Sequence, residues 1–191
     1  MTILVVATGN PGKVKEMQAH LVDLDWELRL KPPELEVEET GTTFAENACL
    51  KASQVALALG EWAIADDSGL EVEALGGAPG VFSARYAESD AACIARLLKE
   101  LENESNRAAR FACAIAIARP DGTIALQAQG ICAGEILRAP QGMGGFGYDP
   151  VFYSPEHQLT FSEMPPEIKR SISHRGKAFQ QLIPQLSKLK N

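Results

Sequence analysis

The sequence predicts an α/β fold whose sheet contains parallel and antiparallel strands. Residues 3–8 form a short apolar run, and a helical period follows over 14–24, where apolar side chains recur three or four residues apart. Residues 26–31 alternate apolar and charged side chains, as a half-buried strand does. This opening is typical of α/β proteins. Two alternating strands within 111–128 flank the hairpin turn at 120–122, so the sheet is expected to be mixed.

The middle of the chain continues this alternation of helices and strands. Thr43 and Glu46 form a capping box, which predicts a helix over 44–60. A buried strand is expected at 62–65 and should end at the polar residues 66–69. Residues 70–74 alternate apolar and acidic side chains, which predicts that they form the next strand.

The remainder of the chain adds two helices and a loop. An amphipathic helix is predicted at 94–101, a glycine-rich loop at 142–147 and a final helix over 179–186, which Pro184 should kink or shorten. No internal repeat or linker interrupts the chain. We therefore expect residues 1–191 to form a single domain, with two lobes.

The composition is that of an ordinary globular protein. The chain has 191 residues, of which 46% are hydrophobic and 23% charged, which argues against disorder, collagen-like repeats and coiled coil. With 18 basic and 25 acidic residues, the net charge is −7. An acidic surface repels polyanions, so we expect no nucleic-acid partner. A small anion could bind only where cations or a metal reverse the charge locally.

Cysteine usage and the N-terminus indicate a cytoplasmic protein. No C-x-x-C pair occurs, and each cysteine lies in an apolar neighbourhood, so buried reduced thiols are expected. The apolar segment from Met1 to Val6 lacks a basic lead and is too short for a signal peptide or a membrane span. The four cysteines are Cys49, Cys93, Cys113 and Cys132.

The segment Thr8–Lys13 connects the first strand to the first helix and is a candidate phosphate site. Such a turn exposes unpaired backbone N–H groups at the positive end of the helix dipole, and glycines allow a phosphate to approach. Lys13 lies where its ammonium could meet that phosphate. The spacing is not that of a Walker loop, and a tight turn with a surface lysine is the alternative interpretation.

Two acidic pairs are candidates for metal binding. Asp66-Asp67 is expected at a strand end and Glu38-Glu39 in an extended acidic stretch. Successive side chains of extended backbone point to opposite faces, so each pair offers one carboxylate to a given site. One aspartate and one glutamate suit Mg²⁺, which retains waters and uses substrate phosphates as ligands. The alternative is that these acids face solvent.

Basic residues supply the candidates for an anion partner. Lys51 is isolated in an apolar helical stretch, where it either reaches solvent or neutralises an anion. Residues 169–177 form the densest basic cluster of the acidic chain. They are candidates to bind an anionic or oxygen-rich ligand, and a solvated helix face is the alternative.

Gly142, Gly144 and Gly147 match G-x-G-x-x-G by spacing alone. A dinucleotide site needs a strand before this motif and a helix opening inside it, whereas extended chain follows here, so a Rossmann site is rejected. The loop instead surrounds an aromatic residue, Phe146, near Asp149. A plain hairpin loop is the other interpretation.

Taken together in this order, the motifs resemble the inosine/xanthosine triphosphate pyrophosphatases, which remove deaminated purine nucleotides. They cover nearly the whole chain, and Pro184 lies outside them. The matching segments are Thr8–Lys13, Glu38–Gly41, Phe44–Ala48 with Lys51, Ala65–Leu70, Gly76–Val81, Ser83–Tyr86, Gly145–Pro150 and Ser173–Gly176.

The resemblance implies an elongated mixed β-sheet with flanking helices, two lobes around a nucleotide-binding cleft, and a homodimer. It implies Mg²⁺-dependent hydrolysis of ITP, dITP and XTP to nucleoside monophosphate and pyrophosphate, which clears them from the nucleotide pool. Glu38 and Asp67 would hold Mg²⁺, and Asp67 would also be the proton acceptor or only orient the water. The substrate-binding residues implied are Thr8, Gly9, Asn10, Pro11, Gly12, Lys13, Lys51, Ser68, Phe146, Gly147, Tyr148, Asp149, Lys169, His174 and Arg175.

Base choice would follow from hydrogen-bond polarity. Hypoxanthine and xanthine present an oxygen at C6, where adenine presents an amino group, so N–H donors of His174 or Arg175 would select them. Two other classes of function remain open at this point. A nucleotide sensor would bind without turnover, and a structural partner protein would need an exposed apolar stripe that the helices do not show.

Overall fold

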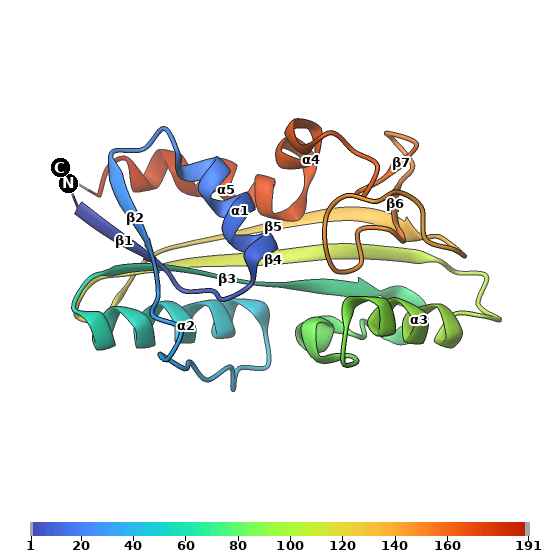
Figure 1. Ribbon diagram of the computed structural model, residues 1–191, viewed down its shortest axis with the longest axis horizontal. Helices are drawn as coiled ribbons and strands as arrows, with labels where there is room; N and C mark the ends of the chain where they lie inside the picture. Colours follow the sequence, from blue (N-terminus) through green and yellow to red (C-terminus); the bar gives the residue numbers. More distant parts are fainter. Residues whose placement is uncertain (1, 190–191) are drawn as a thin grey trace. The chain divides into compact units, whose positions relative to one another are not determined.

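The chain forms a seven-stranded mixed sheet with strand order β2-β1-β3-β4-β5-β6-β7 (Figure 1). β1 pairs in parallel with β2 and β3, whereas β6 is antiparallel to β5 and β7. The computed structural model describes residues 2–189, so Met1 of the apolar N-terminal segment and residues 190–191 lie outside it. The strands are β1 (Thr2–Val6), β2 (Trp26–Leu30), β3 (Trp62–Val72), β4 (Ala108–Ala118), β5 (Ile124–Ile136), β6 (Phe152–Ser154) and β7 (Leu159–Thr160).

The predicted α/β class and mixed sheet are confirmed. The helices are α1 (Pro11–Leu21), α2 (Phe44–Leu59), α3 (Asp90–Glu100), α4 (Pro166–Ile172) and α5 (His174–Leu186), with short 3₁₀ turns η1 (Glu73–Leu75) and η2 (Gly80–Arg85). Within residues 2–189, none of these helices is both long and apolar enough to cross a bilayer.

The chain divides into two compact units. Unit 1 comprises the chain up to Asp67, residues Cys113–Gly130 and the chain from Arg175 onward. Unit 2 comprises Ser68–Ala112 and Ile131–His174. Strands β3, β4 and β5 each contribute residues to both units.

Helices cover both faces of the sheet in unit 1, with α1 and α5 on one face and α2 on the other (Figure 1). Alternation along β3 explains this, because Ile64 joins the core under α1 and α5 while Ala63 and Ala65 join the core under α2. The α2 side is built almost entirely from alanine and valine, which brings that helix close to the strands.

The helix starts follow local sequence. Asn10 caps α1 by accepting from the Lys13 backbone N–H, and Pro11 occupies the first helical position. The predicted capping box of Thr43 and Glu46 is present at α2, which ends at Gly60 in the left-handed conformation.

One expectation about the strands is wrong. Residues 62–65 and 70–74 do not form two strands, because β3 runs unbroken from Trp62 to Val72 through Asp66 and Asp67. Burying a carboxylate is costly unless it is paired and hydrogen-bonded. Here each one is offset by cationic or amide side chains from neighbouring helices, so the strand continues.

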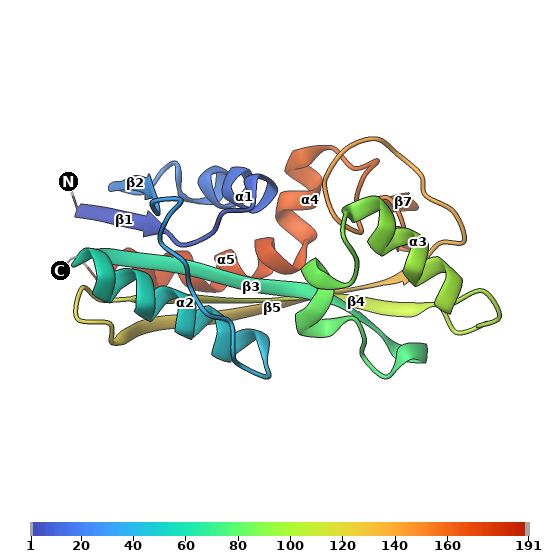
Figure 2. The same ribbon diagram turned by 60° about the horizontal axis from the view of Figure 1, so that its bottom comes forward.

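Unit 2 has its own core, in which side chains of α3 and of the strands pack around aromatic rings. Figure 2 shows the ribbon of α3 and the strands in this part of the chain. Phe111, Phe152 and Phe161 contact one another with centroid separations of 4.6–5.7 Å. Residues 142–147 form an irregular loop, as expected.

Two further expectations concern side chains. All four cysteines are free thiols; Cys93, Cys113 and Cys132 are buried, whereas Cys49 is half-buried. Helix α5 contains Pro184 and ends two residues later at Leu186.

Candidate active site

Asp66 and Asp67 project in opposite directions from β3, as their adjacent positions in extended backbone require. Asp66 is completely buried and contacts Arg175 of α5 and Lys13 of α1, with its Oδ2 at 2.8 Å from Arg175 Nη2 and 3.4 Å from Lys13 Nζ. Burial alone would raise the pKa of Asp66, but Lys13, Arg175 and Lys51 outweigh it and hold that pKa well below its usual range.

Asp67 contacts the other helix of unit 1, α2. Asn47 Nδ2 donates to its Oδ2 over 3.1 Å, and Lys51 Nζ lies 3.4 Å from its Oδ1. Lys51 also binds Glu39 Oε1 at 2.7 Å, so its ammonium links two carboxylates. Burial raises the pKa of Asp67, with Lys51 and Lys13 opposing that rise.

Asn47 is a residue of this cluster to which the sequence assigned no role. It lies four residues before Lys51 on α2, so both side chains emerge from the same helix face. This spacing of four residues is the sequence feature that could have identified Asn47 as a neighbour of Lys51. Burial alone would lower the pKa of Lys51, but Asp67, Asp66 and Glu39 raise it, so the lysine stays charged beside the strand.

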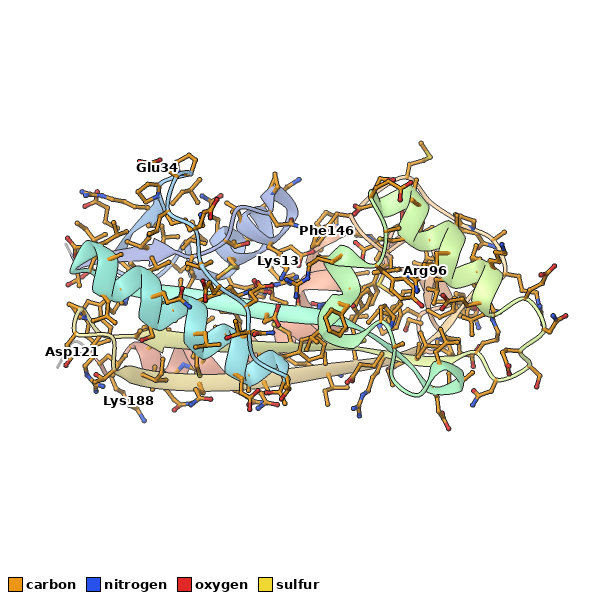
Figure 3. All side chains as sticks on the ribbon, turned by 90° about the horizontal axis from the view of Figure 1, so that it is seen from below. Lys13, Glu34, Arg96, Asp121, Phe146 and Lys188 are labelled. Carbon is orange, nitrogen blue, oxygen red and sulfur yellow. The ribbon has the colours of Figure 1, made fainter. Side chains whose placement is uncertain are left out.

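The loop before α1 brings Lys13 to this cluster. Thr8 Oγ1 accepts from the Asn10 N–H at 3.2 Å, and Asn10 Oδ1 accepts from the Lys13 N–H at 3.1 Å. Lys13, labelled in Figure 3, therefore lies in the first turn of α1 with its ammonium at Asp66. Gly9, Asn10 and Pro11 are exposed residues at the start of this helix.

The carboxylates around Asp67 are of the kind that Mg²⁺ binds, but they are few. Within residues 2–189, no group of three or more acidic, histidine or cysteine side chains is placed to enclose a metal. Asp67 with Glu38 or Glu39 supplies hard oxygens, which fits an ion that takes one or two protein carboxylates and completes its shell with water and substrate phosphates. The residues present therefore suit Mg²⁺ only together with a phosphate ligand.

The two glutamates differ in their surroundings. Glu39 is half-buried against Lys51, whereas Glu38 is exposed. The Glu38 backbone is held by Gln54 of α2, which accepts from its N–H at 3.1 Å and donates to its carbonyl at 3.2 Å. The structure thus fixes the main chain at Glu38 while leaving its carboxylate accessible.

Unit 2 gathers a second group of predicted site residues. Lys169 Nζ lies 2.5 Å from Asp149 Oδ2, and the same oxygen accepts from the Phe146 N–H at 2.9 Å. Lys169 also lies over the Phe146 ring, 5.0 Å from its centroid. Lys169 and Asp149 are buried, whereas Phe146 (Figure 3) is half-buried at the surface. The aromatic face can stack on a planar base, and the ammonium beside it can donate hydrogen bonds to oxygens of that base.

His174 belongs to the aromatic core of unit 2. Its ring stacks on Phe111 with centroids 4.7 Å apart and on Phe161 at 6.4 Å. It is 5% exposed, so the solvated-face interpretation of the basic cluster is wrong for His174 as well as for Lys169 and Arg175. The flat stack fixes the plane of the imidazole ring.

The remaining predicted residues have distinct environments. Arg175 lies in unit 1, where it binds Asp66 and Glu16, so its predicted contact with a base stays a prediction. Ser68 follows Asp67 in β3 and is half-buried. Tyr148 is buried, and its hydroxyl donates to the Ser83 carbonyl at 2.8 Å.

Comparison with known proteins assigns the chain to a family. Residues 4–185 match the model of the Ham1 family. The dITP/XTP pyrophosphatase of Nostoc sp. is 69% identical over 97% of this chain and 94% of its own length, and that of Synechocystis sp. is 60% identical over 100% and 98%. The solved structure of a HAM1 protein from Coxiella burnetii superposes with a TM-score of 0.90 at 44% identity, covering 98% of this chain and 100% of that one. The protein belongs to the Ham1 family.

Proposed function

We propose that the protein is a nucleoside triphosphate pyrophosphatase that hydrolyses ITP, dITP and XTP to the nucleoside monophosphate and pyrophosphate with Mg²⁺, thereby clearing these nucleotides from the pool. The observation that carries this proposal is the placement of two lysines against adjacent buried aspartates, Lys13 at Asp66 and Lys51 at Asp67. The names of the relatives, dITP/XTP pyrophosphatase, support the same reaction.

In this proposal, unit 1 binds the triphosphate. Lys13 and Lys51 supply positive charge in a chain of net charge −7, and the exposed residues Gly9 and Asn10 lie at the N-terminus of α1. Binding phosphate would draw Lys51 partly away from Glu39 and Asp67, which frees carboxylate oxygens. Mg²⁺ held by Glu38 and Asp67 would neutralise phosphate charge and acidify a water.

Asp67 is the proton acceptor in this proposal. Water attacks the α-phosphorus, the bond to the oxygen that bridges the α- and β-phosphates breaks, and pyrophosphate leaves with the electron pair. The proton of the attacking water passes to Asp67. Burial raises the pKa of Asp67, which makes it a stronger base than an exposed aspartate, and Asn47 fixes its orientation.

Unit 2 binds the base in this proposal. The half-buried Phe146 ring stacks on the purine without selecting it, whereas Lys169 and His174 carry N–H groups that pair with the oxygen at C6. The amino group of adenine presents a donor at that position. A buried donor left unpaired costs about 1–3 kcal/mol, so two of them would discriminate strongly against ATP.

A substrate panel tests the proposal. Purified protein is incubated with ITP, dITP, XTP, GTP and ATP with Mg²⁺, and pyrophosphate and orthophosphate are measured separately. We expect pyrophosphate from the first three nucleotides, little from ATP, and loss of turnover with EDTA that excess Mg²⁺ restores. Orthophosphate as the product, or equal turnover of ATP, would contradict the proposal. Tight ITP binding without product would favour a sensor instead.

We also propose a homodimer in the cytoplasm, without nucleic-acid or membrane partners. Light scattering of the purified protein distinguishes a dimer from the monomer of 20.6 kDa. A monomer at micromolar concentration would contradict the assembly while leaving the proposed reaction untouched.

A further inference from the structure

The loop that carries Phe146 is rich in backbone conformations that favour glycine. Gly142, Gly145 and Gly147 all have positive φ, at +88°, +73° and +59°. Glycine loses more conformational freedom on ordering than any other residue, so such a loop needs external contacts to hold one conformation. Because Phe146 lies between two of these glycines, the direction of its ring depends on those contacts.

Two contacts tie the loop to η2 and to the start of α3. The Gly147 N–H donates to Asp90 Oδ2 over 2.8 Å, and the hydroxyl of Tyr148 donates to the Ser83 carbonyl over 2.8 Å. Asp90 is the first residue of α3, and Ser83 lies in η2. All of these residues belong to unit 2.

Ser83 is itself firmly held in unit 2. Its Oγ accepts from the Leu70 N–H at 2.9 Å and donates to the Gly80 carbonyl at 2.6 Å, and its side chain is buried. The anchor of Tyr148 is thus connected to β3 by hydrogen bonds. This gives the Ser83–Tyr86 motif, which the proposed chemistry does not use, a structural role at the base-binding loop.

On the far side of Phe146, the Asp149 carboxylate accepts from the Phe146 N–H at 2.9 Å. The peptide groups on both sides of Phe146 are therefore bound by two carboxylates from different elements. Asp149 also pairs with Lys169, so its removal would disturb several groups at once. Asp90 is exposed at the helix start, which makes it the contact that can be removed cleanly.

We propose that Asp90 is a positioning residue for base recognition, which holds the Gly147 N–H and thereby sets the orientation of Phe146. This inference rests on the proposed function, because Phe146 is assigned to the base there. Without the contact, the loop samples more conformations and the Phe146 ring leaves its place over Lys169. The residues of unit 1 assigned to the phosphates are unaffected. Nucleotide affinity therefore falls, whereas the rate of the chemical step stays the same.

Three variants separate this role from helix stability. Asp90→Ala removes both the acceptor and the negative charge at the start of α3. Asp90→Asn removes the charge but keeps an oxygen that can accept from Gly147. Ser89 caps α3, because its Oγ accepts from the Ala92 N–H at 3.2 Å. Ser89→Ala removes this cap and leaves Asp90 in place.

We expect Asp90→Ala to raise the KM for ITP about 3- to 10-fold, as loss of one hydrogen bond predicts, with kcat within about twofold of wild type. Asp90→Asn should restore most of the lost affinity, and Ser89→Ala should lower the melting temperature without changing KM. An unchanged KM in Asp90→Ala, an equal rise in Ser89→Ala, or no rescue by Asp90→Asn would each overturn the proposal.

Hydrogen exchange provides a readout that does not depend on turnover. The peptide covering residues 142–149 should exchange faster in Asp90→Ala than in wild type and Ser89→Ala, because only that variant releases the Gly147 N–H. Equal protection in all three would refute the positioning role. If wild type releases no pyrophosphate from any nucleotide while Asp90→Ala loosens this peptide, the proposed function fails and the loop anchor stands.

Discussion

Arg175 Nη2 donates to Asp66 Oδ2 over 2.8 Å, and the two side chains are 1% and 0% exposed. The Arg175 guanidinium also donates to Glu16 of α1, so it links helices α1 and α5 to the middle of β3. A charge buried so deeply is tolerated only while its partner is present.

We predict that Arg175→Ala destabilises the protein by about 3–5 kcal/mol, because it leaves the Asp66 carboxylate buried without its nearest cation. Urea unfolding measures this effect. The matched control is Arg29→Ala, which removes an exposed arginine paired with Glu27 and should cost less than about 1 kcal/mol. Similar losses in the free energy of unfolding for both variants would show that the buried pair stabilises the protein no more than the exposed pair does. If Arg175→Ala instead folds normally and narrows only the ITP/ATP ratio, the arginine reads the base.

Asp67→Asn should abolish turnover while leaving the fold intact. The amide can still accept from Asn47, and Lys51 keeps Glu39, so the local packing persists without a group that takes a proton at neutral pH. We expect a loss of at least about 100-fold in kcat, the scale of general-base removal, measured as pyrophosphate release. Asp121→Asn, in the exposed hairpin turn, is the control. Substantial activity in Asp67→Asn would exclude Asp67 as the base.

Glu38→Gln and Glu39→Gln should have different signatures. Glu38 has an accessible carboxylate on a backbone held by Gln54, so its amide variant should need more Mg²⁺ for half-maximal rate. Glu39 pairs with Lys51, so its variant should chiefly alter the KM for the nucleotide. Titrations of rate against Mg²⁺ and against ITP distinguish the two. A raised Mg²⁺ requirement only in Glu39→Gln would transfer the proposed metal contact from Glu38 to its neighbour.

Gly145→Ala should impair base binding more than Gly147→Ala. Both glycines have positive φ, but a Cβ at Gly145 would overlap the Asp149 carboxylate, whereas at Gly147 it meets open space. The clash would separate Asp149 from the Phe146 N–H and from Lys169. Calorimetric titration with IMP should therefore show the larger loss of affinity for Gly145→Ala. Equal losses would mean that backbone strain alone governs the loop.

Thiol reactivity should follow burial. Cys49 is half-buried, whereas Cys113 of β4 is buried in the core, with its pKa raised to about 12 by desolvation and by the nearby Asp66 carboxylate. A raised pKa lowers the thiolate fraction at pH 8, so iodoacetamide should modify Cys49 first and Cys113 only after unfolding. Peptide mass spectrometry with and without urea measures the order. Early modification of Cys113 in the native protein would contradict its burial.

Local sequence patterns determined most of the secondary structure. The capping box at Thr43 and Glu46, the hairpin turn at 120–122 and the alternating strands each depend on neighbouring residues, so they could be recognised without knowledge of the fold. Alternation along extended backbone likewise predicted that Asp66 and Asp67 would serve different partners, as their contacts confirm.

Only the tertiary structure decided how the charged groups are matched. The sequence predicted that a strand would end at the polar residues 66–69, whereas β3 continues because cations 53 and 109 residues away from Asp66 offset the cost of burying its carboxylate. The sequence patterns grouped Arg175 with the residues expected to bind the base. They assigned no role to Asn47 or Asp90, whose contacts with Asp67 and Gly147 appear only in the structure. Contacts between residues far apart in the chain carry no local periodicity, because they depend on how helices and strands pack.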